Sequence, residues 1–336
     1  MPADPAALKL YGGIGSPYTM KVRAALRRMR LDHVFILIDD AAAKRTAEVR
    51  PPIIPVLEHA DGRFETDSTP MLQRLAAAHP AAPAIYPENQ AERFLALLIE
   101  DFADEWLTKA MFHFRWAYEA DAELLSRQLA FDRLRSAGVD ALEDAAAWFK
   151  DRQIARMTIV GCTAETAGLI EAGFERVCAA LNAHVSTHAP FLFGSGPSVA
   201  DFALYGQLFQ LQRDPTPGER MRNTSPWLQR WIEWVDDAAG FEGAPQRLDA
   251  SGPLRGLMDE IGAVYLPFLA ANAASFNAGQ SQFECAIRGG VWRQPVFKYQ
   301  VKCLNALRES YEALDVASRA RIGEALNADA AIEILS

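Results

Sequence analysis

The chain has 336 residues, of which 50% are hydrophobic and 23% are charged, and these proportions are ordinary for a water-soluble protein of two or three domains. Its formal net charge of -9 argues against nucleic acid and anionic membranes as main partners, because both favour a basic surface. No apolar run approaches the roughly 18 residues of a membrane helix, and the N-terminus lacks a leader pattern. We therefore expect a cytoplasmic protein that binds neither membrane nor nucleic acid.

The first eighty residues alternate between strand-like and helix-like patterns. Short strands are predicted at residues 8–11, 33–38, 54–59 and 63–65, and helices at 18–29 and 67–75. Ser16 is then the N-cap of the first helix, and Pro17 is its first residue. The order of strand, helix, strand, loop, strand, strand and helix is the thioredoxin-like arrangement.

Three short motifs lie at the ends of these predicted elements. They are Ser16-Pro17-Tyr18-Thr19, Ile53-Ile54-Pro55-Val56 and Glu65-Thr66-Asp67-Ser68. Each alone has a plain structural interpretation: a helix start, a rigid entry to a strand and a helix cap. Together, in this order, they describe a site for a small acidic thiol peptide, with a hydroxyl at one helix N-terminus, a backbone edge before a proline, and a carboxylate-hydroxyl pair at a second helix.

From about residue 88 the sequence is helical for most of its length. Helical patterns recur at residues 94–106, 111–118, 122–136, 140–149, 166–185, 198–211 and 227–235. Ser198 followed by Asp201 is typical of a capping box, in which both side chains satisfy N–H groups at a helix start. We interpret this pair as serving the folding of its helix rather than ligand binding.

The first of these helices carries an apolar stripe and an acidic run. The stripe consists of Phe94, Leu98, Phe102 and Trp106. The acids, which face elsewhere, are Glu100, Asp101, Asp104 and Glu105. Like charges four residues apart on a helix repel each other slightly, and we interpret the acidic run as a solvated face.

The last part of the chain changes character again. A helix is predicted after residue 253 towards residue 266, followed by a loop rich in Gly, Asn and Ser. Residues 282–287 and 291–296 flank Arg288-Gly289-Gly290 and predict a β-hairpin, because tight hairpin turns need the positive φ angles that glycine tolerates. Two helices, at about 299–314 and 317–326, are predicted to close the chain.

The motifs give the chain a family resemblance. Residues 8 to 80 resemble the N-terminal domain of a glutathione transferase: Ser16 stands at the family's Ser, Tyr or Cys, Ile54-Pro55 at its cis-proline, and Asp67-Ser68 at its acid-serine pair. Ser198 and Asp201 match the capping box of the family's helical second domain. The resemblance implies an α/β thioredoxin-like domain at residues 1–80, an all-α helical-bundle domain at 88–245, and an added α+β C-terminal extension at 250–336.

The resemblance also implies a function and a site. Ser16 is expected to activate the thiol of glutathione, the co-substrate, which is then conjugated to a hydrophobic electrophile as in detoxification. The residues expected to bind glutathione are Pro17, Tyr18, Ile54, Pro55, Asp67 and Ser68. In a homodimer, Asp101 or Asp104 is a candidate to reach the γ-glutamyl ammonium bound in the partner subunit. Met111, Phe112 and Trp116 are expected in the electrophile pocket, with core or dimer contact as the alternative.

One segment departs from the family pattern. Many members have a Lys or Gln before the apolar-proline pair, where it reaches the glycine carboxylate of glutathione, whereas this chain has Pro51-Pro52-Ile53. Arg50 and Lys44 are the nearby cations that can substitute. Two other functions stay open: a glutathione-dependent peroxidase or dehalogenase would share the site, and a non-catalytic ligand-binding protein would keep the fold with an altered site.

Cysteine and histidine add no further site. Cys162, Cys178, Cys285 and Cys303 lack C-x-x-C spacing, so we expect reduced thiols and neither a zinc site nor a disulfide framework. The six histidines show no ligand spacing and no evident partner. The sequence therefore predicts no metal and no imidazole base.

Overall fold

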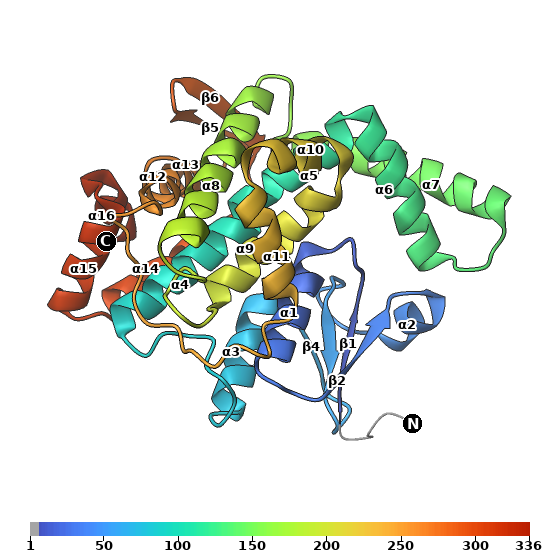
Figure 1. Cartoon of the computed structure of the whole chain (residues 1–336). Helices are drawn as coiled ribbons and strands as arrows, with labels where there is room; N and C mark the ends of the chain where they lie inside the picture. Colours follow the sequence, from blue (N-terminus) through green and yellow to red (C-terminus); the bar gives the residue numbers. More distant parts are fainter. Residues whose placement is uncertain (1–6) are drawn as a thin grey trace.

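The computed structural model of the chain describes residues 7–336. Its N-terminal part is a four-stranded sheet of order β2-β1-β3-β4, in which β1 and β2 are parallel and the other pairs are antiparallel (Figure 1). The strands are β1 (Leu8–Gly12), β2 (His33–Leu37), β3 (Val56–Glu58) and β4 (Phe64–Thr66). The helices are α1 (Pro17–Arg28), α2 (Asp40–Arg45) and α3 (Ser68–Ala78). The thioredoxin-like prediction is confirmed, and α2 lies where only a loop was expected.

The second part is built around one long helical path through the centre of the molecule. It consists of α4 (Gln90–Phe102), a π-helical turn η1 (Ala103–Leu107) and α5 (Thr108–Ala117). The remaining elements are α6 (Glu119–Arg133), α7 (Val139–Ile154), the 3-10 turn η2 (Met157–Val160), α8 (Ala167–Thr187), α9 (Val199–Arg213), α10 (Pro215–Thr224) and α11 (Pro226–Asp236). The α9 helix lies against both α1 and α4, so it joins the first part to the second.

The predicted capping box is present at the start of α9. The Asp201 carboxylate accepts the backbone N–H of Ser198 at 2.8 Å and that of Leu192 at 2.9 Å. Both Ser198 and Asp201 are fully buried, so their polar groups can be satisfied only by each other and by nearby backbone. This pair therefore serves the folding of the helix, as its spacing predicted.

The C-terminal extension contains the predicted hairpin and more helix than the sequence indicated. Its elements are α12 (Arg255–Glu260), the π-helical turn η3 (Ile261–Tyr265), α13 (Leu266–Asn277), β5 (Gln282–Ile287), β6 (Gly290–Pro295), α14 (Lys298–Glu312), α15 (Val316–Leu326) and α16 (Asp329–Leu335). The prediction of a loop after residue 266 is wrong, because α13 continues the helix to Asn277. Phe268 and Leu269 are fully buried in this helix, and their burial outweighs the weak local helix signal.

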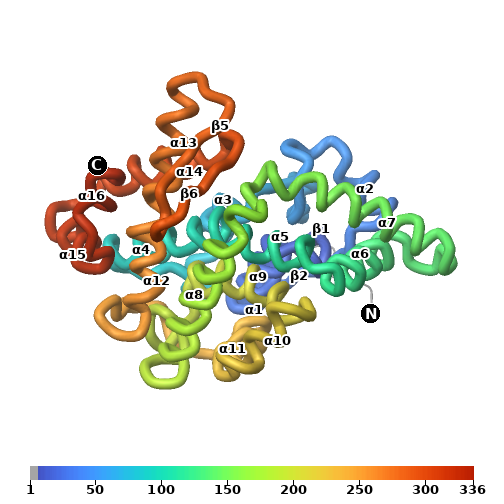
Figure 2. The backbone as a smooth tube through the Cα atoms, turned by 90° about the horizontal axis from the view of Figure 1, so that it is seen from above, coloured from blue at the N-terminus to red at the C-terminus, as the bar shows by residue number. Residues whose placement is uncertain are grey.

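The extension and the α6–α7 pair lie at opposite ends of the molecule (Figures 1 and 2). The extension packs along α4 through α14 and α15. At the other end, Arg133 of α6 pairs with Asp40 of α2 at 3.1 Å, and Arg135 pairs with Asp39. The central helices are therefore enclosed on one side by the extension and on the other by α6 and α7.

The extension shares one hydrophobic core with the helical part. Trp106 of η1 has its ring centroid 5.0 Å from that of Phe268 and 4.9 Å from that of Trp292 on β6. Phe268 and Trp292 are fully buried. Because these aromatic rings lose their water on packing together, the extension is an integral part of the fold.

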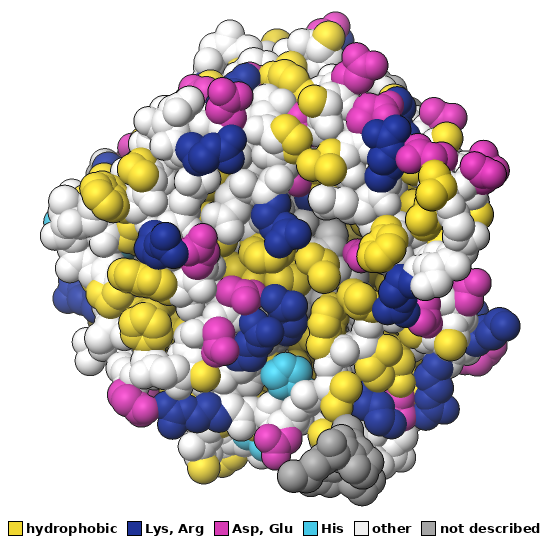
Figure 3. Space-filling model, turned by 45° about the vertical axis from the view of Figure 1, so that its right-hand side comes forward, with side chains coloured by type: hydrophobic (Ala, Val, Ile, Leu, Met, Phe, Trp, Pro, Cys, Tyr) yellow, Lys and Arg dark blue, Asp and Glu magenta, His cyan; other side chains and the backbone are white. Residues whose placement is uncertain are grey.

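The surface shows no segregation of charge on the face drawn in Figure 3, where basic and acidic side chains are intermixed and apolar side chains gather near the centre. Among residues 7–336 the structure contains no helix of the length and hydropathy required to cross a bilayer. Within the same residues, no group of three or more His, Cys, Asp and Glu side chains is arranged to hold a metal ion.

Candidate functional site

The strand register brings the three sequence motifs to one edge of the sheet. Tyr11 at the end of β1 pairs with Val56 at the start of the antiparallel β3, and Val56 pairs with Thr66 at the end of β4. The loop that follows β1, the peptide that precedes β3 and the turn that follows β4 are therefore neighbours. Two helix N-termini, those of α1 and α3, begin at this same edge.

Ser16 is the N-cap of α1, as predicted. Its φ and ψ of -100° and 117° are extended, and its Oγ accepts the backbone N–H of Thr19 at 3.3 Å. A hydroxyl that accepts such a bond keeps its own hydrogen free to donate. The half-buried Ser16 hydroxyl therefore offers a donor beside a helix N-terminus, where the macrodipole favours negative charge.

Tyr18 points away from this edge. Its hydroxyl donates to the carbonyl oxygen of Asp104 at 2.9 Å and so joins α1 to the π-helical turn η1. Burial raises the pKa of Tyr18 well above its ordinary value, and the nearby Glu105 and Asp104 add to that effect. The Tyr18 side chain thus stays a neutral donor in a structural contact, and only its backbone lies at the start of α1.

The peptide before β3 has the predicted form. The Ile54–Pro55 bond is cis, and so is Arg50–Pro51. Thr66 donates its hydroxyl to the carbonyl oxygens of Ile53 and Pro55, each at 3.3 Å. Within residues 7–336, no hydrogen bond uses the backbone N–H or carbonyl of Ile54. This peptide unit is therefore free to pair with the backbone of an extended ligand.

Asp67 has an unusual backbone and a carboxylate that does not cap its own helix. Its φ and ψ of 73° and 106° lie in a region that side-chain-bearing residues rarely adopt. Although Asp67 is the N-cap of α3, its side chain makes no capping hydrogen bond, so the interpretation of Asp67 as a simple helix cap is wrong. Its Oδ2 instead accepts the hydroxyl of Tyr299, from the extension, at 3.1 Å. Strain of this kind is typical of residues held in place for ligand binding.

A buried ion cluster lies directly beneath Asp67 and Ser68. The Lys21 Nζ lies 2.5 Å from Glu100 Oε1, 2.6 Å from Asp104 Oδ2 and 3.4 Å from Ser68 Oγ. Burial lowers the pKa of Lys21, but Asp104 and Glu100 outweigh burial and leave it above its ordinary value. Lys21 is therefore a cation that holds two carboxylates and the serine of the acid-serine pair in place.

The acidic run of α4 and η1 is buried, so the prediction of a solvated face is wrong. Glu100, Asp104 and Glu105 are only 1%, 8% and 9% exposed. Lys21 pairs with the first two, and Gln300 of the extension donates to Glu105 at 3.2 Å. The π-helical turn adds one residue to the helical repeat, which turns acids from this run towards α1 and the extension.

Asp101 contacts the chain's own extension. Its Oδ2 accepts the hydroxyl of Tyr265 at 2.6 Å, and burial raises the pKa of Asp101 to about 6. The role suggested by the resemblance, a contact with glutathione in a partner subunit, stays a prediction. Asp104, the alternative candidate, is held by Lys21 instead.

A cavity of about 490 Å³ opens beside the loop that carries Ser16. Its floor includes Ile14 and Gly15, next to Ser16 in the chain, and most of its wall comes from α6 and α7. The apolar wall residues are Leu124, Leu125, Leu129, Phe131, Val139 and Leu142. The cavity is therefore mainly apolar and adjoins the N-terminus of α1.

The residues predicted for the electrophile pocket lie elsewhere. Met111, Phe112 and Trp116 do not line this cavity. Met111 and Trp116 are buried at 7% and 4% exposure, and the rings of Phe112 and Trp116 are 6.4 Å apart. They take part in the packing of α5, and their role in an electrophile pocket stays a prediction.

The loop between β1 and α1 is fixed from the helical part. Arg115 donates to the carbonyl of Gly15 at 3.1 Å, and Gln210 donates to that of Ile14 at 2.8 Å. Arg115 is itself held by the buried carboxylate of Asp214 at 2.9 Å. These bonds position the cavity floor and the start of α1 relative to each other.

The two candidate cations near the cis-proline peptide are exposed and have no carboxylate partner among the described residues. Arg50 donates to the backbone carbonyls of Ala47 at 2.7 Å and Val49 at 2.8 Å. Lys44 lies at the end of α2. Both side chains can therefore approach an anionic ligand group without breaking an ion pair.

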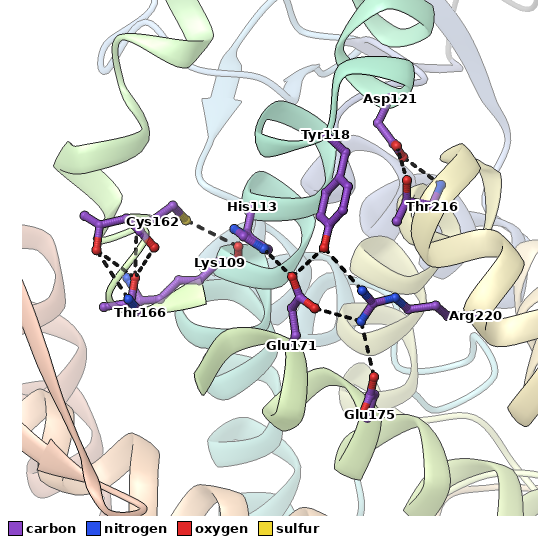
Figure 4. A network of polar contacts seen from close by, with 11 residues as sticks. Lys109, His113, Tyr118, Asp121, Cys162, Thr166, Glu171, Glu175, Thr216 and Arg220 are labelled. Carbon is purple, nitrogen blue, oxygen red and sulfur yellow. Dashed lines mark hydrogen bonds and ion pairs between the residues drawn. The ribbon is translucent and has the colours of Figure 1, made fainter. Parts of the chain in front are cut away.

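A separate polar network joins α5, α8 and α10 (Figure 4). Glu171 accepts the Tyr118 hydroxyl at 2.6 Å, lies 2.9 Å from His113 Nε2 and pairs with Arg220 at 2.8 Å. Burial would raise the pKa of Glu171, but the bonds from Tyr118, His113 and Arg220 hold it below its usual range. The expectation that no histidine has a partner is thus wrong for His113, whose contact with Glu171 joins α5 to α8.

Two family models match separate segments of the chain. Residues 10–83 match the glutathione S-transferase N-terminal domain, and residues 130–233 match the glutathione S-transferase C-terminal domain. The chain belongs to the glutathione S-transferase family. No curated protein matches this sequence.

Solved structures resemble this chain at low identity. The β-etherase LigF from a Sphingobium species is 19% identical with a TM-score of 0.49, over 68% of this chain and 95% of the other. A rice glutathione S-transferase in complex with glutathione is 19% identical with a TM-score of 0.43, over 72% and 93%. A tau class enzyme from mango is 18% identical with a TM-score of 0.42, over 69% and 89%.

Sequence reasoning missed several residues that shape the candidate site. Lys21 gave one signal, because it is a cation among the apolar residues Met20 and Val22 of α1. Arg115 and Gln210 lie in apolar helices in the same way. Tyr299 gave no signal of its contact with Asp67, since 232 residues separate the two.

Proposed function

We propose that this member of the transferase family binds glutathione across the sheet edge, stabilises its thiolate through Ser16 and conjugates it to a hydrophobic electrophile. The observation that carries the proposal is the convergence of the Ser16 hydroxyl, the free Ile54 peptide and the strained Asp67 at one edge. Family membership supports glutathione as the thiol. A homodimer and a cytoplasmic location stay predictions of the same resemblance.

The thiol end of the site must stabilise an anion. A free thiol has a pKa of about 8.5, so only a few per cent is thiolate at neutral pH. A helix N-terminus contributes about 0.3 to 2 kcal/mol to a nearby anion, and a hydroxyl donated to a charged acceptor adds about 1.5 to 3 kcal/mol. At about 1.36 kcal/mol per pH unit, the two together lower the thiol pKa by about one to three units.

Serine at position 16 also restricts the reaction. A cysteine there could form a mixed disulfide with glutathione and exchange thiols, and serine cannot. The nucleophile is then the sulfur of glutathione, and the carbon that it attacks would lie in the apolar cavity beside Gly15. The sulfur-carbon bond forms as the leaving group departs, so the enzyme supplies thiolate stabilisation and orientation.

The opposite end of the site suits an ammonium group. The Asp67 carboxylate lies near a buried cluster in which Lys21 already pairs with Glu100 and Asp104. Asp67 itself has no cationic partner among the described residues. The γ-glutamyl ammonium of glutathione would pair with Asp67, and the N-terminus of α3 at Ser68 would accept its α-carboxylate. Arg50 or Lys44 would approach the glycine carboxylate in place of the missing Lys or Gln.

Isothermal calorimetry with glutathione tests the proposal directly. We expect wild type to bind, and Asp67→Ala to bind at least about 10-fold more weakly, because the ammonium loses its charged partner. Glu48→Ala, which removes an exposed acid from the same domain, is the matched control and should bind like wild type.

Two outcomes would contradict the proposal. Absence of heat with wild type at millimolar glutathione would favour the non-catalytic ligand-binding function, to which the Pro51-Pro52-Ile53 segment already points. Binding without conjugation of any aryl halide, but with turnover of a peroxide, would favour the glutathione-dependent peroxidase.

A further inference from the structure

The C-terminal extension reaches the expected glutathione site at one point. Tyr299, in the first turn of α14, donates its hydroxyl to Asp67 Oδ2 at 3.1 Å. The side chain is 42% exposed, so it lies at the rim of the site and is not part of the core. This contact is the only hydrogen bond of the Asp67 carboxylate within residues 7–336.

The position of Tyr299 is fixed by its neighbours in the extension. The next residue, Gln300, is 3% exposed and donates to Glu105 at 3.2 Å. The residue before α14, Phe297, exchanges two backbone hydrogen bonds with the Asn272 side chain, at 2.9 and 3.0 Å. Because the backbone is held on both sides, the Tyr299 hydroxyl is presented to Asp67 in a defined place.

The chemistry of the contact leaves room for a ligand. An ionised carboxylate has about four acceptor positions on two oxygens, and Tyr299 uses one of them. Burial raises the pKa of Tyr299, and the Asp67 charge raises it further, so the phenol remains a neutral donor. A donor at Oδ2 restricts rotation of the carboxylate and leaves Oδ1 available to an ammonium group.

We propose that Tyr299 is a positioning residue for glutathione binding, through which the extension orients the Asp67 carboxylate towards the γ-glutamyl ammonium within a single chain. The inference rests on the proposed function, since it concerns the same site. It assigns to the extension a part in ligand recognition in addition to its part in the core.

Calorimetry with two ligands tests the inference. The probes are glutathione and its analogue without the α-amino group, and the variant is Tyr299→Phe, which removes only the hydroxyl. We expect this variant to bind glutathione about 5- to 20-fold more weakly, within the range of a hydrogen bond to a charged group, and to bind the analogue within 2-fold of wild type. In the Asp67→Asn background, Tyr299→Phe should cause no further loss of affinity for glutathione.

The control is Tyr311→Phe, in the same helix. The Tyr311 ring is 4% exposed, and its hydroxyl makes no hydrogen bond within residues 7–336. This variant should bind both ligands like wild type. A Tyr299→Phe loss that is equal for glutathione and the analogue would indicate a general structural effect and would overturn the inference.

The remaining outcomes separate the two proposals. If wild type binds glutathione and Tyr299→Phe binds it equally well or more tightly, this inference is overturned and the proposed function stands. Tighter binding by the variant would mean that Tyr299 competes with the ammonium for Asp67. Failure of wild type to bind glutathione would overturn the proposed function, and this inference with it.

Discussion

At the scale of single residues, Ser16 combines a structural and a chemical role. Its Oγ accepts the Thr19 N–H, as is common for a serine N-cap, while its hydrogen remains free to donate. The two roles use different parts of one hydroxyl. They can therefore be separated by an experiment that measures the ligand rather than the fold.

We expect Ser16→Ala to raise the thiol pKa of bound glutathione by about one to two pH units, because the donated hydrogen bond is lost while the helix N-terminus remains. The affinity of the variant for glutathione should change little. The measurement is a thiolate absorbance titration of the complex, with aryl halide turnover as a second readout. Asn89→Ala, which removes the N-cap bond to Glu92 at the start of α4, controls for the loss of a cap. Superimposable titrations of wild type and Ser16→Ala would show that the serine is only a cap.

At the scale of secondary structure, the π-helical turn η1 determines where the acidic run goes. Within this turn, Asp104 contacts Lys21 of α1, and Glu105 contacts Gln300 of the extension. Burial raises the pKa of Glu105 to about 8, with Asp101 and Asp104 adding to the effect and the Gln300 hydrogen bond opposing it. The Glu105 carboxyl is therefore mainly protonated in the folded chain at neutral pH.

This shift predicts a pH dependence of stability. An unfolded glutamate has a pKa of about 4.3, so the folded state binds more protons than the unfolded state between about pH 4.3 and the folded pKa. Stability from this group is full below that window and is lost as pH rises through about 8. At pH 8.5 we expect the free energy of unfolding of Glu105→Gln, measured by urea denaturation, to exceed that of wild type by about 1 to 3 kcal/mol. Near pH 5 the two free energies of unfolding should differ little.

The control for this prediction is Glu219→Gln, on the exposed face of α10, which should leave the pH profile of unfolding unchanged. Parallel profiles for wild type and Glu105→Gln would contradict the prediction. They would mean that Glu105 is ionised in the folded state, with Lys109 and Gln300 sufficient to hold the charge.

At the scale of the whole molecule, the extension and the helical part share one hydrophobic core. Trp292 is fully buried between Trp106 and Phe268, and the Lys109 ammonium lies 5.2 Å from the Trp292 ring centroid. Trp292 is therefore a core residue. Tyr299, in contrast, is partly exposed and contacts the expected site through Asp67.

We expect Trp292→Ala to lower the free energy of unfolding by about 3 to 5 kcal/mol, the usual cost of removing a large buried aromatic side chain. Urea unfolding followed by circular dichroism measures this loss. Trp227→Ala, at a position that is 60% exposed, should cost far less. A similarly small cost at Trp292 would show that the extension packs only loosely on the helical part, and a chain ending near residue 249 should then be soluble.

Local patterns determined much of this protein from the sequence alone. The Ser16 cap, the Ser198 and Asp201 capping box, and the 282–296 hairpin depend on residues a few positions apart. The order of strands and helices then implied that the three motifs meet, because sheet pairing follows from connection lengths and alternation. The family and the candidate glutathione site could therefore be predicted from the sequence.

Contacts between distant parts of the chain were decided only by the tertiary structure. Lys21 lies 83 residues from Asp104, and Tyr299 lies 232 residues from Asp67, so no local pattern links either pair. The apolar cavity beside the Ser16 loop is walled by α6 and α7, and Arg133 of α6 pairs with Asp40 of α2 from a distant part of the chain. The acidic run was interpreted as a solvated face, but it is buried. A charged side chain can be buried when a partner of opposite charge lies nearby, and only the packing of distant segments brings that partner close.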